Sequence, residues 1–265
     1  MALRSEKATF AAIVTALVLA PALFAEQELR YDVEHSHSNW WPPVKAALTD
    51  DGSGTLVVTE RGISYQETSK KKDKKPEQLH HATLEYQDIQ QLYVSPNKLT
   101  VLTYKDRKWR LGLDKEYEFT LPSGQSFSDA YALLKDRLDQ RFVAAFADEA
   151  VAPLWHIPVK LLGLISGSEG VLMVTPERIV YKTDRKEQSR TWRFPDIENI
   201  STSGPFQLTL TTFERAKVHY GNLKGFNFEL KQPLDEKRFN ILWRRLNQTK
   251  GLELLTSIEE RKTEQ

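Results

Sequence analysis

Two close pairs of histidines could supply imidazole ligands to a metal ion, because imidazole suits zinc, copper and nickel. His35 and His37 form one pair, and His80 and His81 form the other. The chain has no cysteine, and no carboxylate stands at a spacing that would complete a ligand set. The two pairs also fall in different segments. We therefore expect solvated loop histidines and no metal.

The serines and aspartates that could act in catalysis lack the neighbours that catalysis needs. Ser53 and Ser168 stand beside glycines, but neither lies in a G-x-S-x-G elbow. Asp88 and Asp196 recur at matching places, where an aspartate usually bonds backbone amides to fix a turn. Glycine motifs for phosphates and dinucleotides are absent. We expect no catalytic residue, no cofactor and no enzymatic activity.

Two basic runs are the strongest local feature of the chain. Either run would attract an anionic partner, and Trp109 has the amphipathic ring that suits an interface. The alternative is that lysine-rich loops simply stay solvated. The candidate ligand-binding residues are Lys70, Lys71, Lys72, Lys74 and Lys75 in the first run, and Lys105, Arg107, Lys108, Trp109 and Arg110 in the second.

The first residues have the order of a secretory signal peptide, since Arg4 and Lys7 precede an apolar run from Phe10 to Ala20. We expect residues 1–25 to be cleaved after Ala22 or Ala25 and the protein to be exported to the periplasm or the outside. The alternative is an uncleaved membrane anchor. That reading needs about 20 apolar residues, a length this run approaches only by including its proline.

The charge of the remaining chain is balanced. Removing residues 1–25 takes away Arg4, Glu6 and Lys7, which leaves equal numbers of basic and acidic side chains. A protein that grips nucleic acid needs an overall basic footprint, so we expect no nucleic acid partner. The expected partner is an unknown protein or an anionic surface, with peripheral membrane contact as one option. The oligomeric state stays open.

The chain after residue 25 contains an internal sequence repeat. Segment 54–65 recurs as 170–181, and segment 117–121 recurs as 226–230, always in the same order. The lead-ins also match, because Trp40 and Pro43–Lys45 correspond to Trp155 and Pro158–Lys160. We expect one unit at residues 39–147, a linker at 148–153, a second unit at 154–250 and a polar tail at 251–265.

In each unit, apolar and polar residues first alternate as in the strands of an antiparallel meander. The spacing of the apolar residues then changes to that of a helix. Apolar residues alternate with polar ones at Tyr117, Phe119 and Leu121, as in a half-buried strand. Apolar residues at steps of three and four then predict an amphipathic helix at the end of each unit. These are Phe127, Tyr131, Leu134, Leu138, Phe142 and Phe146 in the first unit, and Phe239, Leu242, Trp243 and Leu246 in the second.

The string Gly170-x-Leu172-x-Val174-Thr175-x-x-Arg178-Ile179-x-Tyr181, with its later helix, resembles the pleckstrin-homology-like superfamily, especially its GRAM and bacterial branches. The resemblance implies a mainly β fold of two tandem pleckstrin-homology-like antiparallel rolls or barrels, each capped by an α-helix. It implies a core position for Trp243. The turns at Glu60–Gly62 and Pro176–Arg178 are short and mixed in charge, so the family's phosphoinositide binding is not implied.

Such a scaffold favours a non-catalytic binding or interaction module that works outside the cytoplasm on an unknown ligand. The second hypothesis is a structural component whose two units pack rigidly and dock on an envelope assembly. An enzyme of unknown type is third. Ligand binding predicts an open pocket with aromatic walls and polar tips, whereas docking predicts an exposed apolar patch.

Overall fold

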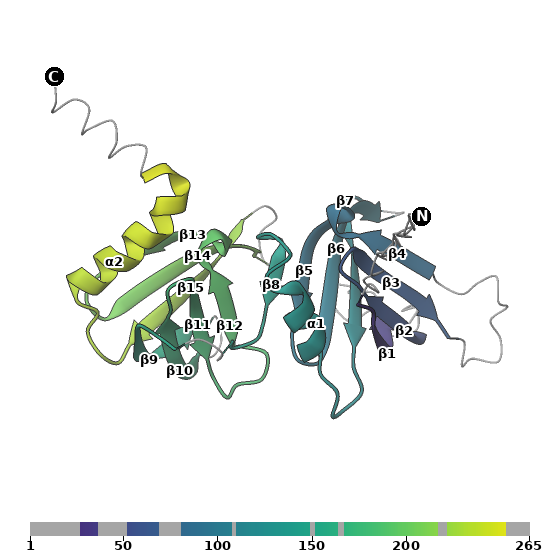
Figure 1. Ribbon diagram of the computed structural model, residues 1–265, viewed down its shortest axis with the longest axis horizontal. Coiled ribbons are helices and arrows are strands. Elements are labelled where there is room, and N and C mark those ends of the chain that lie inside the picture. Colours follow the sequence, from purple (N-terminus) through teal and green to yellow (C-terminus); the bar gives the residue numbers. More distant parts are fainter. Residues whose placement is uncertain are drawn as a thin grey trace, which may run out of the picture.

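The computed structural model describes residues 27–36, 52–68, 81–107, 110–148, 152–163, 167–216 and 222–252. This part of the chain is mainly β, with fifteen strands in one continuous sheet. Two α-helices accompany the strands (Figure 1). Neither helix of the described part is long and apolar enough to cross a membrane.

We call residues 29–148 the first unit. Its strands are β1 (Leu29–Ser36), β2 (Gly52–Val58), β3 (Gly62–Glu67), β4 (His81–Glu85), β5 (Ile89–Val94), β6 (Lys98–Arg107) and β7 (Arg110–Thr120). The 3-10 turn η2 (Tyr86–Asp88) links β4 to β5, and α1 (Ser128–Leu134) follows β7. A short strand, β8 (Phe142–Ala144), comes after the helix.

We call residues 155–252 the second unit. Its strands are β9 (Trp155–Leu162), β10 (Ser168–Val174), β11 (Arg178–Lys182), β12 (Arg190–Arg193), β13 (Ile197–Ser201), β14 (Gln207–Arg215) and β15 (Leu223–Leu230). The 3-10 turn η3 (Phe194–Asp196) stands before β13. Helix α2 (Glu236–Asn247) and the turn η4 (Gln248–Leu252) end the described chain.

The two units share one strand order. The first strand of each pairs on one side with the second strand and on the other side with the seventh, which gives β5-β6-β7-β1-β2-β3-β4 and β13-β14-β15-β9-β10-β11-β12. Strand β8 joins the two sets, because it pairs with β5 in parallel and with β12 in antiparallel. The repeat in the sequence therefore corresponds to a repeat in topology.

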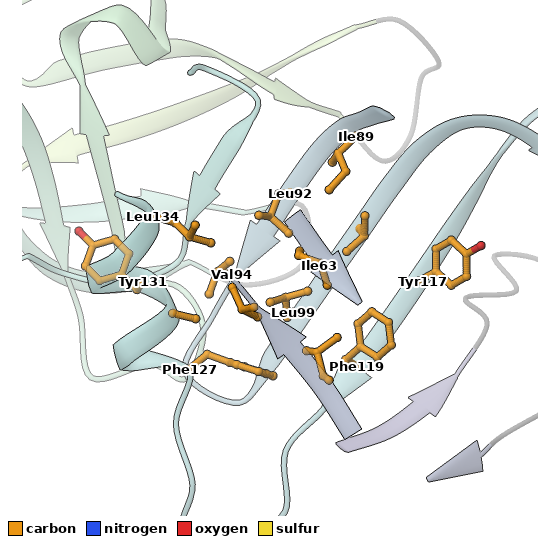
Figure 2. Packing of buried hydrophobic residues seen from close by; sticks show 14 of the residues in the cluster. Ile63, Ile89, Leu92, Val94, Leu99, Tyr117, Phe119, Phe127, Tyr131 and Leu134 are labelled. Atoms are coloured by element: carbon orange, nitrogen blue, oxygen red, sulfur yellow. The ribbon is translucent and has the colours of Figure 1, made fainter. Parts of the chain in front are cut away.

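Each unit buries its own hydrophobic cluster. The alternating residues point inward as the pattern predicts: Leu56, Ile63, Ile89 and Phe119 are buried in the first unit, and Leu172, Ile179, Ile197, Phe228 and Leu246 are buried in the second. Figure 2 shows the first cluster converging between the strands and α1, which contributes Phe127 from its N-cap and Leu134 from its last turn. Leu138 is partly buried against it.

The first strand of the first unit was missed in the sequence. β1 begins at Leu29, before the expected start at residue 39, and pairs with β2 as β9 pairs with β10. Trp40 and Pro43–Lys45, the expected lead-in, lie outside the described residues, as does the expected signal peptide at 1–25. The tail from residue 253 onward also lies outside them.

The closing helix of the first unit is shorter than the spacing predicts. α1 ends at Leu134, and Phe142 lies in β8 instead of on a helix. All three residues of β8 are buried, and the strand is paired along both edges, with β5 on one side and with β12 on the other. Phe142 fits the helical spacing of apolar residues because it is a buried strand residue, although it does not lie on a helix.

The expected core position of Trp243 is also wrong. The buried residues of α2 are Leu242 and Leu246, while Trp243 is 38% exposed. Successive residues of a helix are turned by about 100° about its axis, so Trp243 falls at the edge of the face that Leu242 buries.

Candidate functional site

The structure describes part of the basic site predicted from the sequence. Lys105 is exposed near the end of β6, and the backbones of Arg107 and Arg110 pair where β6 turns into β7. Lys108 and Trp109 lie outside the described residues. So do Lys70, Lys71, Lys72, Lys74 and Lys75, which belong to the connection between β3 and β4.

Strand direction fixes the end of the unit from which these connections leave. β1 is antiparallel to β7, and β1, β2, β3 and β4 are antiparallel in turn. The end of β1, the end of β3 and the start of β7 therefore point the same way. The β1–β2, β3–β4 and β6–β7 connections therefore leave their strands on the same side of the first unit, which we call the loop end. The β6–β7 turn lies far along β7 from the end of β1, because β1 pairs with Glu118–Thr120.

A cleft of about 350 Å³ opens beside the end of β1, between the start of β2 and the end of β7. Its lining is polar and comprises Glu34, His35, Ser36, Gly52, Ser53 and Thr120. The imidazole of His35 is buried and stacks on the ring of Tyr65, with the two centroids 5.0 Å apart. The ring of Phe119 lies 5.3 Å from the imidazole on another side. The cleft thus has polar walls and an aromatic cluster behind His35.

The corresponding end of the second unit carries different residues. Ser168 takes the place of Gly52, and Leu161 takes the place of His35, since each pair is opposed across its first two strands. The Ser168 hydroxyl lies 2.9 Å from the Tyr181 hydroxyl, which donates to the Ser168 carbonyl at 2.8 Å. These bonds tie the start of β10 to β11 in the second unit.

The glycine at position 52 is part of the difference. A Cβ at Gly52 would lie 2.5 Å from Oε1 of Glu67, which is too close for any real side chain. A serine like that of the second unit would force the Glu67 side chain to move. The carboxylate of Glu67, itself buried, therefore depends on a glycine opposite it.

A second concentration of polar groups lies at the junction between the units. Asp148, the first residue of the expected linker, is buried, and its carboxylate accepts hydrogen bonds from Arg178 Nη1 at 2.6 Å and Lys135 Nζ at 3.1 Å. Its backbone N–H donates to Thr191 Oγ1, which donates to the Phe146 carbonyl at 2.8 Å. The buried charge is thereby paired from both units.

Further arginines of the second unit reach across the same junction. Arg193 donates to the carbonyls of Leu138 and Asp139 at 2.7 and 3.1 Å. Arg215 Nη1 lies 3.0 Å from the Asp114 carboxylate and also contacts the Gln90 side chain. Backbone pairing through β8 and these side-chain bonds join the two units.

Aromatic groups complete the junction. The Arg190 guanidinium stands 5.4 Å from the centroid of the Tyr93 ring. Burial raises the pKa of Tyr93, and burial together with the nearby Asp148 charge raises the pKa of Tyr131 to about 12. Both phenols stay neutral over the ordinary pH range, so the junction charges come from the arginines, lysines and carboxylates.

The junction residues were missed in the sequence, although a signal was present. By register, Arg178, Arg190 and Arg193 occupy the places that Gly62, Ala82 and Glu85 occupy in the first unit. Three arginines in strands, at positions where the other copy carries none, mark a surface special to one copy. In the sequence, Arg178 stands out only as part of the repeated string from Gly170 to Tyr181, and that string does not indicate the contact with Asp148.

The remaining sequence candidates take structural places. The Asp196 carboxylate accepts from the Arg193 backbone N–H at 2.9 Å and so fixes η3, as expected, whereas Asp88 is exposed on η2. His81 is exposed and bonds Thr83. His37 and His80 lie outside the described residues. Within the described ranges, no group of three or more His, Asp or Glu side chains could hold a metal ion.

No protein family model matches the chain, and no curated protein is similar to it. The chain is similar to the crystal structure of the C-terminal domain of an unknown protein from Leishmania infantum, with 12% identity, 36% of this chain and 84% of that chain covered, and a TM-score of 0.28. It is also similar to the structure of the Spt16D Pob3N heterodimer, with 8% identity, 77% and 97% of the chains covered, and a TM-score of 0.27.

Proposed function

We propose that the protein is a non-catalytic binding module, exported after removal of residues 1–25, whose first unit binds an anionic surface through its loop end. In this proposal each unit is a pleckstrin-homology-like roll capped by its helix. The shared strand order and the position of α1 and α2 after the seventh strands support that assignment.

One observation carries the binding proposal. The β3–β4 connection, which holds Lys70 to Lys75, follows the end of β3, the β6–β7 connection follows the end of β6, and the strand directions start both connections from the same side of the first unit, which supports a shared basic surface there. Cations gathered at one end of a compact unit attract an anionic surface together, and each adds up to about 1 kcal/mol when it lies near that surface.

The second unit offers a comparison within the same chain. Its β11–β12 connection carries Asp184, Arg185, Lys186 and Glu187, so two acidic and two basic residues balance each other there. Arg185 donates to the Gly167 carbonyl at 2.7 Å and Ser189 bonds Thr183, so this connection is tied to the unit. Binding by a loop end should therefore belong to the first unit.

Liposome co-sedimentation tests the proposal. The wild type is compared with a variant in which Lys70, Lys71, Lys72, Lys74 and Lys75 are all changed to Gln, on vesicles with and without phosphatidylglycerol. We expect the wild type to bind the anionic vesicles, to release them as salt rises, and to lose most binding in the variant.

The matched control removes five exposed cations of the second unit, with Lys160, Lys182, Arg185, Lys186 and Lys231 changed to Gln. It should bind nearly as the wild type does. Equal binding by wild type and the loop variant, or equal loss in both variants, would leave the lysines as a solvated loop.

The junction favours a second candidate function, a structural component that docks on an envelope assembly. Asp148 and Arg178 are both buried and paired between the units, and β8 is hydrogen-bonded to both. A rigid two-unit body suits a scaffold. Affinity purification of the tagged full chain from cross-linked cell envelopes, with Arg178→Ala as comparison, would detect a protein partner that depends on this rigidity.

A further inference from the structure

The two outermost strands of the described sheet are counterparts of the strands that form the junction. The sheet begins with β13 and ends with β4. In the shared strand order, β13 corresponds to β5 and β4 corresponds to β12, and β5 and β12 are the strands that β8 joins. Each unit thus uses one of these edges inside the chain and leaves the other at an end of the sheet, where a further chain can pair.

Helix α2 gives the second unit a surface that corresponds to the junction surface of the first unit. The two helices align at their first residues, Ser128 and Glu236, and at the buried Leu134 and Leu242. Three places that follow the buried leucine then correspond: Trp243, Arg244 and Asn247 stand where the first unit has Lys135, Asp136 and Asp139.

All three residues of the first unit at these places bind at the junction. The ammonium group of Lys135 contacts the buried junction carboxylate at 3.1 Å. The Asp136 carboxylate lies 3.7 Å from Nη2 of Arg178, and the Asp139 carbonyl accepts a hydrogen bond from Arg193 at 3.1 Å. The second unit therefore presents, at the end of α2, the same three places with which the first unit holds its neighbour.

The three residues of α2 form one continuous strip along the helix. About the helix axis, Asn247 is turned by about 40° and Arg244 by about 100° from Trp243, so Asn247 lies between the other two. Trp243 is 38% exposed, and Arg244 is exposed beside it. An exposed indole ring next to a guanidinium is the composition of an interface centre, because Trp and Arg are the residue types enriched among its strongest contacts.

The charges at the two ends of the molecule complement each other. By register, the exposed Glu85 of β4 stands where Arg193 stands in β12. Arg178 and Arg193 are opposed across β11 and β12, so a residue that contacts the first of them reaches the neighbourhood of the second. Asp136 makes that contact inside the chain, and Arg244 is its counterpart. A contact of the same geometry between chains would place Arg244 beside Glu85, with the two signs exchanged.

We propose that the protein assembles head to tail, with the α2 end of one second unit docked on the β4 edge of the first unit of a second copy. The occupant is another copy of this chain because the contact continues the junction between the units. Figure 1 shows α2 and β4 at opposite ends of the molecule, so one chain does not close the contact on itself. Such a heterologous contact adds one copy after another.

Sedimentation velocity of the purified protein tests the assembly. The weight-average sedimentation coefficient should rise continuously with concentration up to roughly 0.1 mM, where contacts of micromolar Kd are saturated. It should pass the value of a dimer, because a head-to-tail contact leaves both ends of every assembly open. A monomer throughout this range, or a plateau at the dimer, overturns the proposal.

A charge exchange tests the pairing of Arg244 with Glu85. Arg244→Glu should weaken the association at least about tenfold, because it brings two carboxylates together, and Glu85→Arg should do the same with two guanidinium groups. A chain with both changes should recover most of the association, since every contact again joins opposite charges. Two weakened single variants without recovery in the double variant overturn the proposal.

The ring of Trp243 and a matched control complete the test. Trp243→Ala should weaken the association at least about tenfold, as expected for a central tryptophan. Lys237→Glu reverses an exposed charge in the first turn of α2, and its counterpart Asp129 bonds Ser128 of its own unit. This control should associate as the wild type does, and an equal loss in it overturns the proposal. Thermal unfolding of all variants should match the wild type, because the changed side chains are exposed.

Discussion

The carboxylate of Asp148 lies 2.6 Å from the guanidinium of Arg178, and both side chains are at least nine-tenths buried. The two residues are thirty positions apart and come from different units, so their pairing closes the junction. A buried ion pair adds little by itself, but loss of one partner leaves an uncompensated buried charge.

Arg178→Ala should therefore destabilise the protein by about 3 to 5 kcal/mol. Arg238→Ala, which removes an exposed arginine paired with Asp235, should cost less than about 1 kcal/mol. Urea unfolding of both variants measures the difference. Asp148→Ala combined with Arg178→Ala should cost clearly less than the sum of the two single changes, and simple additivity would contradict a direct coupling.

The glycine beside the cleft leads to a second prediction. Gly52→Ser should destabilise the first unit by about 1 to 3 kcal/mol, because the new Cβ meets the Glu67 carboxylate. The reciprocal change, Ser168→Gly, should cost about 1 to 2 kcal/mol through the lost hydroxyl bond to Tyr181. Thermal unfolding measures both. A neutral or stabilising Gly52→Ser would mean that the cleft has room for the hydroxymethyl group.

The turn before β8 predicts a pH dependence. Hydrogen bonds from Arg141 hold the pKa of Asp139 below its ordinary value. A carboxyl whose folded pKa is lowered adds stability above its unfolded pKa and loses it as pH falls through the folded pKa. The ionised Asp139 carboxylate should add less than about 1 kcal/mol to the free energy of unfolding, because half of its side chain is exposed.

Asp139→Asn should then unfold more easily than the wild type at neutral pH, and the gap should close on acidification below about pH 4. Urea unfolding at a series of pH values checks this. The exposed Asp235→Asn, which removes an N-cap, serves for comparison. A gap that widens toward acid would give the opposite sign and refute the pairing with Arg141.

Export predicts a defined mature end. The protein isolated from its producing cell should begin at residue 23 or 26, because Ala22 and Ala25 follow the small-residue geometry that signal peptidase accepts. β1 begins at Leu29, just behind both sites, so cleavage spares the sheet. If intact-mass spectrometry instead finds a protein in the membrane fraction that still carries Met1, residues 1–25 act as a membrane anchor.

The strands that repeat could be predicted because their pattern depends on local alternation. Tyr117, Phe119 and Leu121 are all buried, and so are Phe226, Phe228 and Leu230. Each of these strands has one face on a core, so the side-chain period alone identifies it. The aspartate of η3 was predictable for the same reason, since its partner stands three residues away.

The missed features depend on contacts between distant residues. β1 alternates in the same way, with Val33 and His35 buried, but residues 37–51 separate it from β2 and the two copies no longer align there. β8 shows no alternation because all three of its residues are buried. The partner of Arg178 could not be read from the sequence, since a buried arginine and a solvated one look alike until the two units are placed together.

The position of β8 has a consequence for proteolysis. An isolated first unit, cut in the stretch between Asp148 and Trp155, would keep Phe142–Ala144 on its sheet but lose β12 from the other side of that strand. A short apolar strand with an open hydrogen-bonding edge recruits strands from other molecules. Proteolytic cleavage between the units should therefore yield fragments that oligomerise through this open edge. In the intact chain, β12 of the second unit pairs with β8 and so keeps that edge from pairing with other molecules.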